Sequence, residues 1–166
     1  MPGSSRNRAR NVFEPVEASR VVQLWQERFG MDLEAFSGLR FFKKASSIWA
    51  ISDAELPRLS YESLGMRIMN CKDRPWKPTT AALQLFGRHA TKNLVHLEGG
   101  EARLFLQGAS QPLPEHCNAG ACQPGYVVVF YRGDALGCGL YSHGMLVSQI
   151  PKERRMEGRS GELGQT

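Results

Sequence analysis

Three side chains with metal-binding or nucleophilic chemistry lie close together in the sequence, at His116, Cys117 and Cys122. A structural zinc site needs four ligands, usually in paired Cys-x2-Cys units, and the sequence offers no second pair. A thiol beside an imidazole can also act as nucleophile and base, but adjacent residues in a loop do not hold the required geometry. We therefore predict no metal, no cofactor and no catalytic residue here, and the role of the three side chains stays open.

A second group of residues combines positive charge with an aromatic ring. Lys72, Arg74, Trp76 and Lys77 surround an indole with three cations in a segment that also contains two prolines. This composition is typical of a surface for single-stranded or looped RNA, where the cations hold phosphates and the ring stacks on a nucleobase. A tryptophan in a loop can equally pack against the core, and that alternative stays open.

Further basic residues could extend the same surface. They are Arg88 and Lys92 near a predicted helix, Arg132 in a predicted turn, and Lys152, Arg154 and Arg155 after the last predicted strand. Such clusters contact phosphates, and arginine adds a bidentate geometry that lysine lacks. A solvated run of surface charge is the competing interpretation.

Two glycines in a predicted strand, Gly137 and Gly139, are two residues apart and leave one face of the strand bare. Either a nucleic-acid backbone approaches that face, or the strand bends there. Gly133 beside Arg132 suits a turn between strands.

Charge is concentrated at the ends of the chain. The net charge is +5 in 166 residues, and residues 1–10 contribute three arginines, Arg6, Arg8 and Arg10, without an acid. Residues 11–150 nearly balance, with 14 basic against 13 acidic residues. The basic tail is either a solvated end or a contact for a polyanion such as RNA.

Composition excludes several classes of protein. With 42% hydrophobic residues the chain can bury a single core. It has no run of about 18 to 20 apolar residues, and no apolar segment follows its charged N-terminus, so we expect neither a membrane span nor secretion. We expect a cytoplasmic protein, whose four cysteines stay free thiols in a reducing compartment.

The periodicity of the sequence predicts the elements that position these residues. A helix with the apolar stripe Val21, Leu24, Trp25 and Phe29 begins near Pro15 and ends at Gly30. The other predicted elements are a hairpin over 39–51, a strand over 65–71, a helix capped by Thr79, a strand over 94–97, a helix over 101–108, an exposed loop over 109–125, and strands over 125–133, 135–142 and 144–149.

Two segments, 77–97 and 127–155, resemble the PUA-like RNA-binding domain found with Sun-type (Fmu-type) rRNA cytosine-5 methyltransferases and in small stand-alone ribosome-biogenesis proteins. The matching motifs are Lys77-Pro78-Thr79, Gly87-Arg88 with Asn93, Arg132-Gly133 with Leu136-Gly137-Cys138-Gly139-Leu140, and Ile150-Pro151-Lys152 with Arg154 and Arg155. The chain departs from the family pattern at Ser148, where the family usually has asparagine. The resemblance covers roughly residues 15–155.

The resemblance implies an α+β fold, a small PUA-like pseudo-barrel of short mixed strands with about three helices. We expect a basic disordered tail over 1–12, an N-terminal helical segment over 13–36, the PUA-like RNA-binding domain over 37–155 and a disordered tail over 156–166. In that fold the helix opened by Lys77 packs beside the strand that leads to Lys152. These basic residues are therefore expected to converge on one face.

The resemblance also implies the function. We expect an RNA-binding protein of ribosome biogenesis or of rRNA or tRNA modification, which supplies RNA recognition to a methyltransferase in trans or works with a ribosomal assembly factor. The chain lacks the cofactor-binding domain and the Pro-Cys dipeptide of the related methyltransferases, so we do not expect an enzyme. The alternative is a protein-docking module with little RNA contact, which binds its partner through Trp25, Phe29 and Met31.

Overall fold

The computed structural model describes residues 12–52, 65–117 and 122–157. This described part contains three α-helices, α2 (Ala18–Phe29), α3 (Thr80–Phe86) and α4 (Gly99–Leu106), and two five-stranded sheets. The predicted α+β class with about three helices is therefore confirmed. The predicted basic tail, with Arg6, Arg8 and Arg10, and most of the predicted C-terminal tail lie outside the described residues, and the predicted domain boundaries stay a prediction.

The first sheet is antiparallel and contains β1 (Glu14–Val16), β2 (Leu39–Lys44), β3 (Ser47–Ser52), β4 (Met66–Asn70) and β5 (Lys77–Pro78), in that order. The predicted hairpin is confirmed as β2 and β3, and the helix ends at Gly30 as predicted, where φ is +64°. The predicted start of the helix is wrong. Pro15 lies in β1 opposite Phe42, and α2 begins only at Ala18, because the preceding residues extend the sheet.

The second sheet has the order β6-β8-β9-β10-β7 and curls into a pseudo-barrel, as predicted. Its strands are β6 (Leu94–Leu97), β7 (Ser110–Pro112), β8 (Gly125–Tyr131), β9 (Asp134–Ser142) and β10 (Met145–Ser148). The pair β6 and β8 is parallel and the other pairs are antiparallel, so the sheet is mixed. The prediction of an exposed loop over 109–125 is wrong at β7, where the buried Gln111 pairs with Leu146 and donates to Glu101 O at 2.9 Å.

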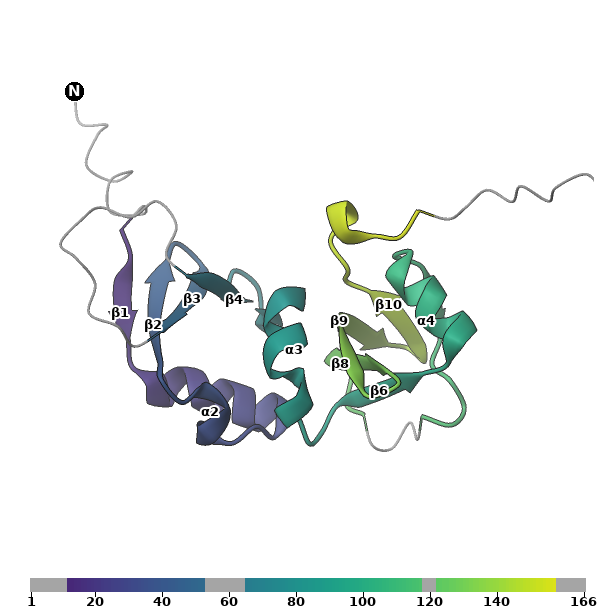
Figure 1. Ribbon diagram of the computed structural model, residues 1–166, viewed down its shortest axis with the longest axis horizontal. Helices are drawn as coiled ribbons and strands as arrows, with labels where there is room; N and C mark the ends of the chain where they lie inside the picture. Colours follow the sequence, from purple (N-terminus) through teal and green to yellow (C-terminus); the bar gives the residue numbers. More distant parts are fainter. Residues whose placement is uncertain (1–11, 53–64, 118–121, 158–166) are drawn as a thin grey trace, which may run out of the picture.

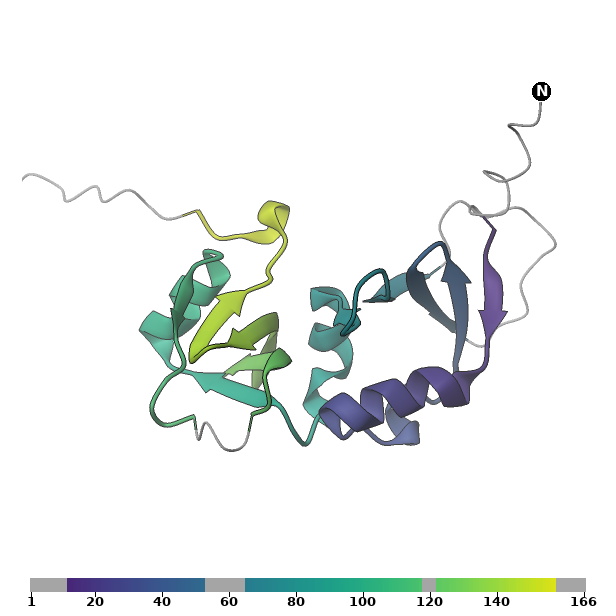
Figure 2. The ribbon, with the colours of Figure 1, turned by 180° about the vertical axis from the view of Figure 1, so that it is seen from behind.

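Helix α3 stands between two lobes, which we define as the first sheet with α2 and the second sheet with α4 (Figures 1 and 2). Strand β8 is buried on both faces. Val128 and Phe130 pack in one cluster with α2 and α3, whereas Val127 and Val129 pack in a second cluster with Phe105 of α4. The expected single core is thus wrong, because helices cover both faces of the second sheet. No helix in the described part of the chain is long and apolar enough to cross a membrane.

The paired glycines of β9 allow neighbouring elements to pack closely. A Cβ at Gly137 would lie 2.8 Å from Thr80 Cγ2 of α3, and one at Gly139 would lie 2.6 Å from Leu146 Cδ1 of β10. The bare face is therefore filled by the protein's own side chains, and a nucleic-acid backbone does not approach it. These glycines lie opposite Val129 and Val127. The nearby Leu136 and Leu140 are only half-buried, and Leu136 packs against the cluster that contains these valines.

The two lobes are joined around the buried Asn93, which has a left-handed backbone with φ of +58°. Its Nδ2 donates to Arg28 O at 2.6 Å, and its Oδ1 accepts from Gln123 N at 2.9 Å. The Arg28 side chain crosses the same joint, since Nε donates to Tyr126 O at 2.8 Å and Nη2 donates to Gln123 O at 2.9 Å. The end of α2 is thus tied to the start of β8.

We predict that Asn93→Ala lowers the free energy of unfolding by about 2–4 kcal/mol, because it removes two buried hydrogen bonds and strains a left-handed position. Asn93→Gly removes the same hydrogen bonds but tolerates the positive φ, so it should recover about 1 kcal/mol. Urea unfolding of the two variants separates the contributions. An Asn93→Ala protein as stable as the original would show that the joint does not depend on this residue.

Candidate nucleic-acid interface

Lys77 lies beside the end of the last strand, as the topological argument predicts. Its Nζ donates to Gln149 Oε1 at 2.7 Å. Together with Arg67 and Pro151, these two residues line a polar hollow of about 160 Å³ between the lobes, which we call the lysine hollow. Its remaining lining residues are Asn70, Pro78, Thr79 and Thr80. None of these described lining residues carries a carboxylate, so the hollow is electropositive.

Hydrogen bonds fix the segment that carries Lys77. Thr79 caps α3 as predicted, since its Oγ1 accepts from Ala82 N at 3.1 Å. The same hydroxyl donates to Arg67 O at 2.8 Å, which ties the start of α3 to β4. Thr80 Oγ1 accepts from Cys138 N at 3.4 Å, which ties it to β9. Lys77 therefore projects from a rigid backbone.

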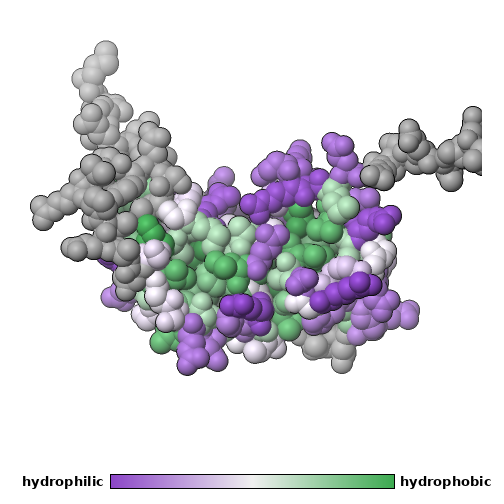
Figure 3. Space-filling model, in the orientation of Figure 1, coloured by the Kyte–Doolittle hydropathy of each residue, from purple (hydrophilic) through white to green (hydrophobic). Residues whose placement is uncertain are grey.

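The basic residues after β10 do not all behave alike. Lys152 and Arg154 are exposed in the 3₁₀ turn η4 (Lys152–Arg154), directly after Pro151, with the acidic Glu153 between them. Figure 3 shows hydrophilic side chains gathered along the upper edge of the second lobe, where η4 lies in Figure 1. Arg155 instead donates from Nε to Ile150 O at 3.0 Å, and its guanidinium covers Gly108 after α4. Arg155 thus fastens the C-terminal segment.

Ser148, where the chain departs from the family pattern, is buried next to this turn. Its Oγ donates to Phe105 O at 2.7 Å and accepts from Ile150 N at 3.3 Å. The serine therefore joins β10 to α4 and fixes the approach to Pro151.

Three of the predicted residues lie at the other end of α3. Arg88 is exposed in η2 (Gly87–His89), which follows that helix, and Arg132 lies in the β8–β9 turn with its guanidinium 5.2 Å from the Tyr131 ring. Lys92 is near this helix in the sequence but does not continue it. Helix α3 ends at Phe86, and Lys92 N bonds to Phe29 O at 3.3 Å beside the end of α2. The expected single face is therefore split between the two ends of α3.

The segment over 72–76 is partly packed. Lys72 and Arg74 are exposed, but the half-buried Trp76 has its ring centroid 5.0 Å from that of Trp25 and 5.9 Å from that of Phe29. The indole thus packs against the core, which was the competing interpretation of this residue. It is not an open stacking surface.

The proposed docking segment is not accessible. Trp25, Phe29 and Met31 are all 0% exposed, at the centre of the first cluster. The expectation that they form a protein-binding face is therefore wrong, because the apolar stripe of α2 packs inside its own lobe.

The side chains of His116, Cys117 and Cys122 cover the outer edge of β6. His116 Nε2 lies 2.8 Å from His96 O, Cys117 Sγ donates to the same carbonyl at 3.4 Å, and Cys122 Sγ donates to Leu94 O at 3.2 Å. These contacts satisfy carbonyl groups that an edge strand leaves unpaired. Burial raises the pKa of both thiols above their ordinary value, so neither is an activated nucleophile. Burial also raises the pKa of Cys138 to about 12.

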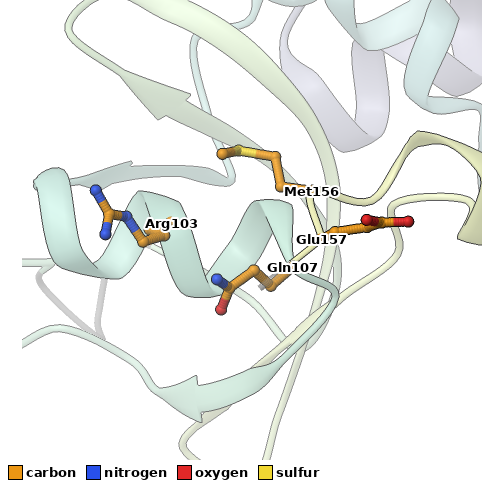
Figure 4. A pocket seen from close by; sticks show the side chains of 4 residues that line it. All are labelled: Arg103, Gln107, Met156 and Glu157. Atoms are coloured by element: carbon orange, nitrogen blue, oxygen red, sulfur yellow. The ribbon is translucent and has the colours of Figure 1, made fainter. Parts of the chain in front are cut away.

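A larger hollow, of about 410 Å³, lies where the C-terminal segment crosses α4. It is lined by Arg103, Gln107, Met156 and Glu157, and Figure 4 shows these side chains pointing in different directions. A ligand site needs polar groups that converge, so this hollow is a poorer candidate than the lysine hollow.

Sequence reasoning missed Arg67 and Gln149, which share the lysine hollow with Lys77. Neither belongs to a run of basic residues or to a motif. They reach Lys77 only through the pairing of β4 with β5 and the course of the chain after β10. Only a pattern that reports long-range contacts could have identified these two residues, because their local sequence spacing does not.

Comparison with known proteins finds a family match over the second lobe. Residues 92–156 match the family model described as the methyltransferase RsmF PUA domain. No curated protein matches the chain. The match begins one residue before Asn93 and includes Arg132, the paired glycines of β9 and the η4 turn, whereas Lys77 and the first lobe lie outside it. PUA domains bind RNA, so the match supports RNA recognition in general. The segment over residues 92–156 is thus similar to the PUA-like domain of the Sun/Fmu-type rRNA methyltransferases.

Proposed function

We propose that this protein binds structured RNA across the lysine hollow and the η4 turn, through Arg67, Lys77, Lys152 and Arg154. The single observation that carries the proposal is the contact between Lys77 and Gln149. It brings a lysine from outside the PUA-like segment to the start of the turn that closes that segment. Residues that are more than 70 positions apart in the sequence thus form one electropositive surface.

The chemistry of these residues suits a phosphate backbone. One proton of the Lys77 ammonium is used by Gln149, which leaves two N–H donors for a ligand. Arg67, Lys152 and Arg154 are exposed, so their charges face solvent and an approaching polyanion. Phosphate contacts of this kind position RNA without reading its sequence. Recognition by shape is therefore the mode that the surface supports.

The proposal includes no chemistry by the chain itself. The thiols of Cys117, Cys122 and Cys138 are held in their protonated form by burial, so they do not supply a nucleophile near neutral pH. In this account a separate RNA methyltransferase or ribosomal assembly factor acts on the RNA that this protein holds. We place this role in rRNA or tRNA modification during ribosome biogenesis in the cytoplasm, by analogy with the family of the PUA-like segment.

Charge reversal of Lys152→Glu with Arg154→Glu should weaken binding to a structured RNA by about 1–3 kcal/mol. It should also reduce the slope of log affinity against log salt by about one unit for each lost phosphate contact. We chose Arg154 and not Arg155, because Arg155 holds the C-terminal segment and its loss would confuse folding with binding. Fluorescence anisotropy at several salt concentrations measures both quantities.

A matched control is Arg20→Glu with Arg103→Glu, which makes the same change in net charge on exposed positions of α2 and α4. It should leave both affinity and salt slope close to those of the original protein. Equal losses in the two double variants would mean that only net charge matters. No loss in the Lys152 and Arg154 variant, with a normal melting temperature, would place the RNA elsewhere.

The purified chain should not bind S-adenosylmethionine, because its sequence has no glycine-rich turn after a first strand to cradle the cofactor. Titration calorimetry with the cofactor, in the presence and absence of RNA, should give no binding heat. A dissociation constant in the micromolar range would contradict the proposal that methylation is carried out by a partner.

A further inference from the structure

A second hollow lies next to the lysine hollow, on the other side of Pro78, which lines both. We call it the proline pocket. Its walls are formed by Pro75, Pro78, Pro124, the Trp76 indole, the Tyr126 ring and the Arg28 guanidinium. Arg28 and Trp76 come from the first lobe and from its last loop, whereas Pro124 and Tyr126 belong to the second lobe. The pocket therefore exists only where the lobes meet.

Fixed side chains shape this pocket. Trp76 is held from behind by Trp25 and Phe29, and Arg28 is held by the carbonyls of Gln123 and Tyr126. These two hydrogen bonds use Nε and Nη2, and Nη1 has no hydrogen-bond partner among the described residues. The pocket thus offers flat apolar walls with a cationic donor at its side. Planar aromatic groups with hydrogen-bond acceptors are the ligands that such walls suit.

The positive charge of Lys77, next to the pocket, favours a planar group that carries an anion. Lys77 Nζ lies 5.8 Å from the centroid of the Tyr126 ring, so the cation of the lysine hollow stands over a wall of the proline pocket. A nucleotide carries an anionic phosphate next to an aromatic base. Its two parts therefore match the two neighbouring hollows in both charge and shape.

The size of the pocket limits how a base can enter. Its volume is about 60 Å³, well below the roughly 150 Å³ of an apolar cavity that holds benzene. A whole base does not fit, so only one edge enters while the ring rests on the pocket rim. In an RNA duplex the base edges are paired and turned inward, and only unpaired bases can be splayed out in this way.

We propose that the proline pocket receives the edge of an unpaired nucleobase whose phosphate lies at Lys77. The inference rests on the proposed RNA-binding function and adds that the bound RNA carries a bulged or looped nucleotide. The pocket therefore recognises an unpaired base in the RNA and not a particular base sequence.

The test compares two hairpin RNAs that differ in one position. Both carry a single bulged nucleotide in the stem, which is 2-aminopurine in one and an abasic ribose in the other. The base-containing hairpin should bind about 5- to 150-fold more tightly, the range expected for one stacked base. The fluorescence of 2-aminopurine should also fall on binding, as the ring of the base packs on the pocket rim. This comparison uses the unaltered protein and does not depend on how any variant folds.

Three variants test whether the preference for the 2-aminopurine hairpin depends on the proline pocket. Tyr126→Ala removes a wall and should reduce the preference for the 2-aminopurine hairpin over the abasic one to less than 2-fold. Tyr126→Phe keeps the ring and should keep the preference. Tyr141→Ala, which removes a half-buried tyrosine that packs in the other cluster, should also keep it. Circular dichroism melting checks that each variant is folded.

The outcomes separate this inference from the proposed function. Equal binding of the two hairpins, with a normal salt dependence, overturns the nucleobase pocket and leaves the RNA-binding function standing. In that case an aromatic side chain of a protein partner becomes the better occupant. A Tyr126→Ala protein that folds and keeps the full preference also overturns the inference. If neither hairpin binds at any salt concentration, the proposed function fails together with it.

Discussion

The left-handed backbone of Asn93 and the two hydrogen bonds of its amide decide how the two lobes meet. The residue stands between α3 and β6 and bonds to the end of α2 and to the segment that leads into β8. Few residue types combine a tolerated positive φ with a short side chain that both donates and accepts. The Arg28 guanidinium reinforces the same joint from the other lobe. Polar groups at this joint, together with the apolar cluster that β8 shares with α2 and α3, therefore set the relative placement of the sheets.

Both hollows of the candidate interface follow from this joint. The lysine hollow needs β4 and α3 on one side and the end of β10 on the other, and the proline pocket needs Arg28 and Tyr126 together. Each hollow has one side from the first lobe and the other side from the second lobe. The segment that matches the PUA family includes Asn93 and Lys152 but not Lys77 or Arg28. In the proposed account, elements that precede the PUA-like segment in the sequence complete its binding surface.

Local sequence patterns predicted most of the elements, and the family resemblance predicted that Lys77 lies near the strand that leads to Lys152. Thr79 as a helix cap, Gly30 as a helix end and the three strands from Gly125 onward all follow from short-range chemistry. The errors concern long-range geometry. Periodicity could not show that Trp76 is held by Trp25, that Arg155 covers Gly108 or that Gln111 enters a strand, because each depends on a partner distant in the sequence. Local patterns likewise did not show that the predicted basic residues divide between the two ends of α3, and their binding to RNA stays a prediction.

The central claim is that RNA lies across the joint between the lobes. Ultraviolet cross-linking of the whole protein to a bulged hairpin RNA, followed by mass spectrometry of the nucleotide-bearing peptides, tests this most directly. The account predicts cross-links in the peptides that contain Trp76 with Lys77, Tyr126 and Lys152, from both lobes of the same molecule. Cross-links confined to the β2–β3 hairpin or to the outer face of α4, with none in these three peptides, would contradict it.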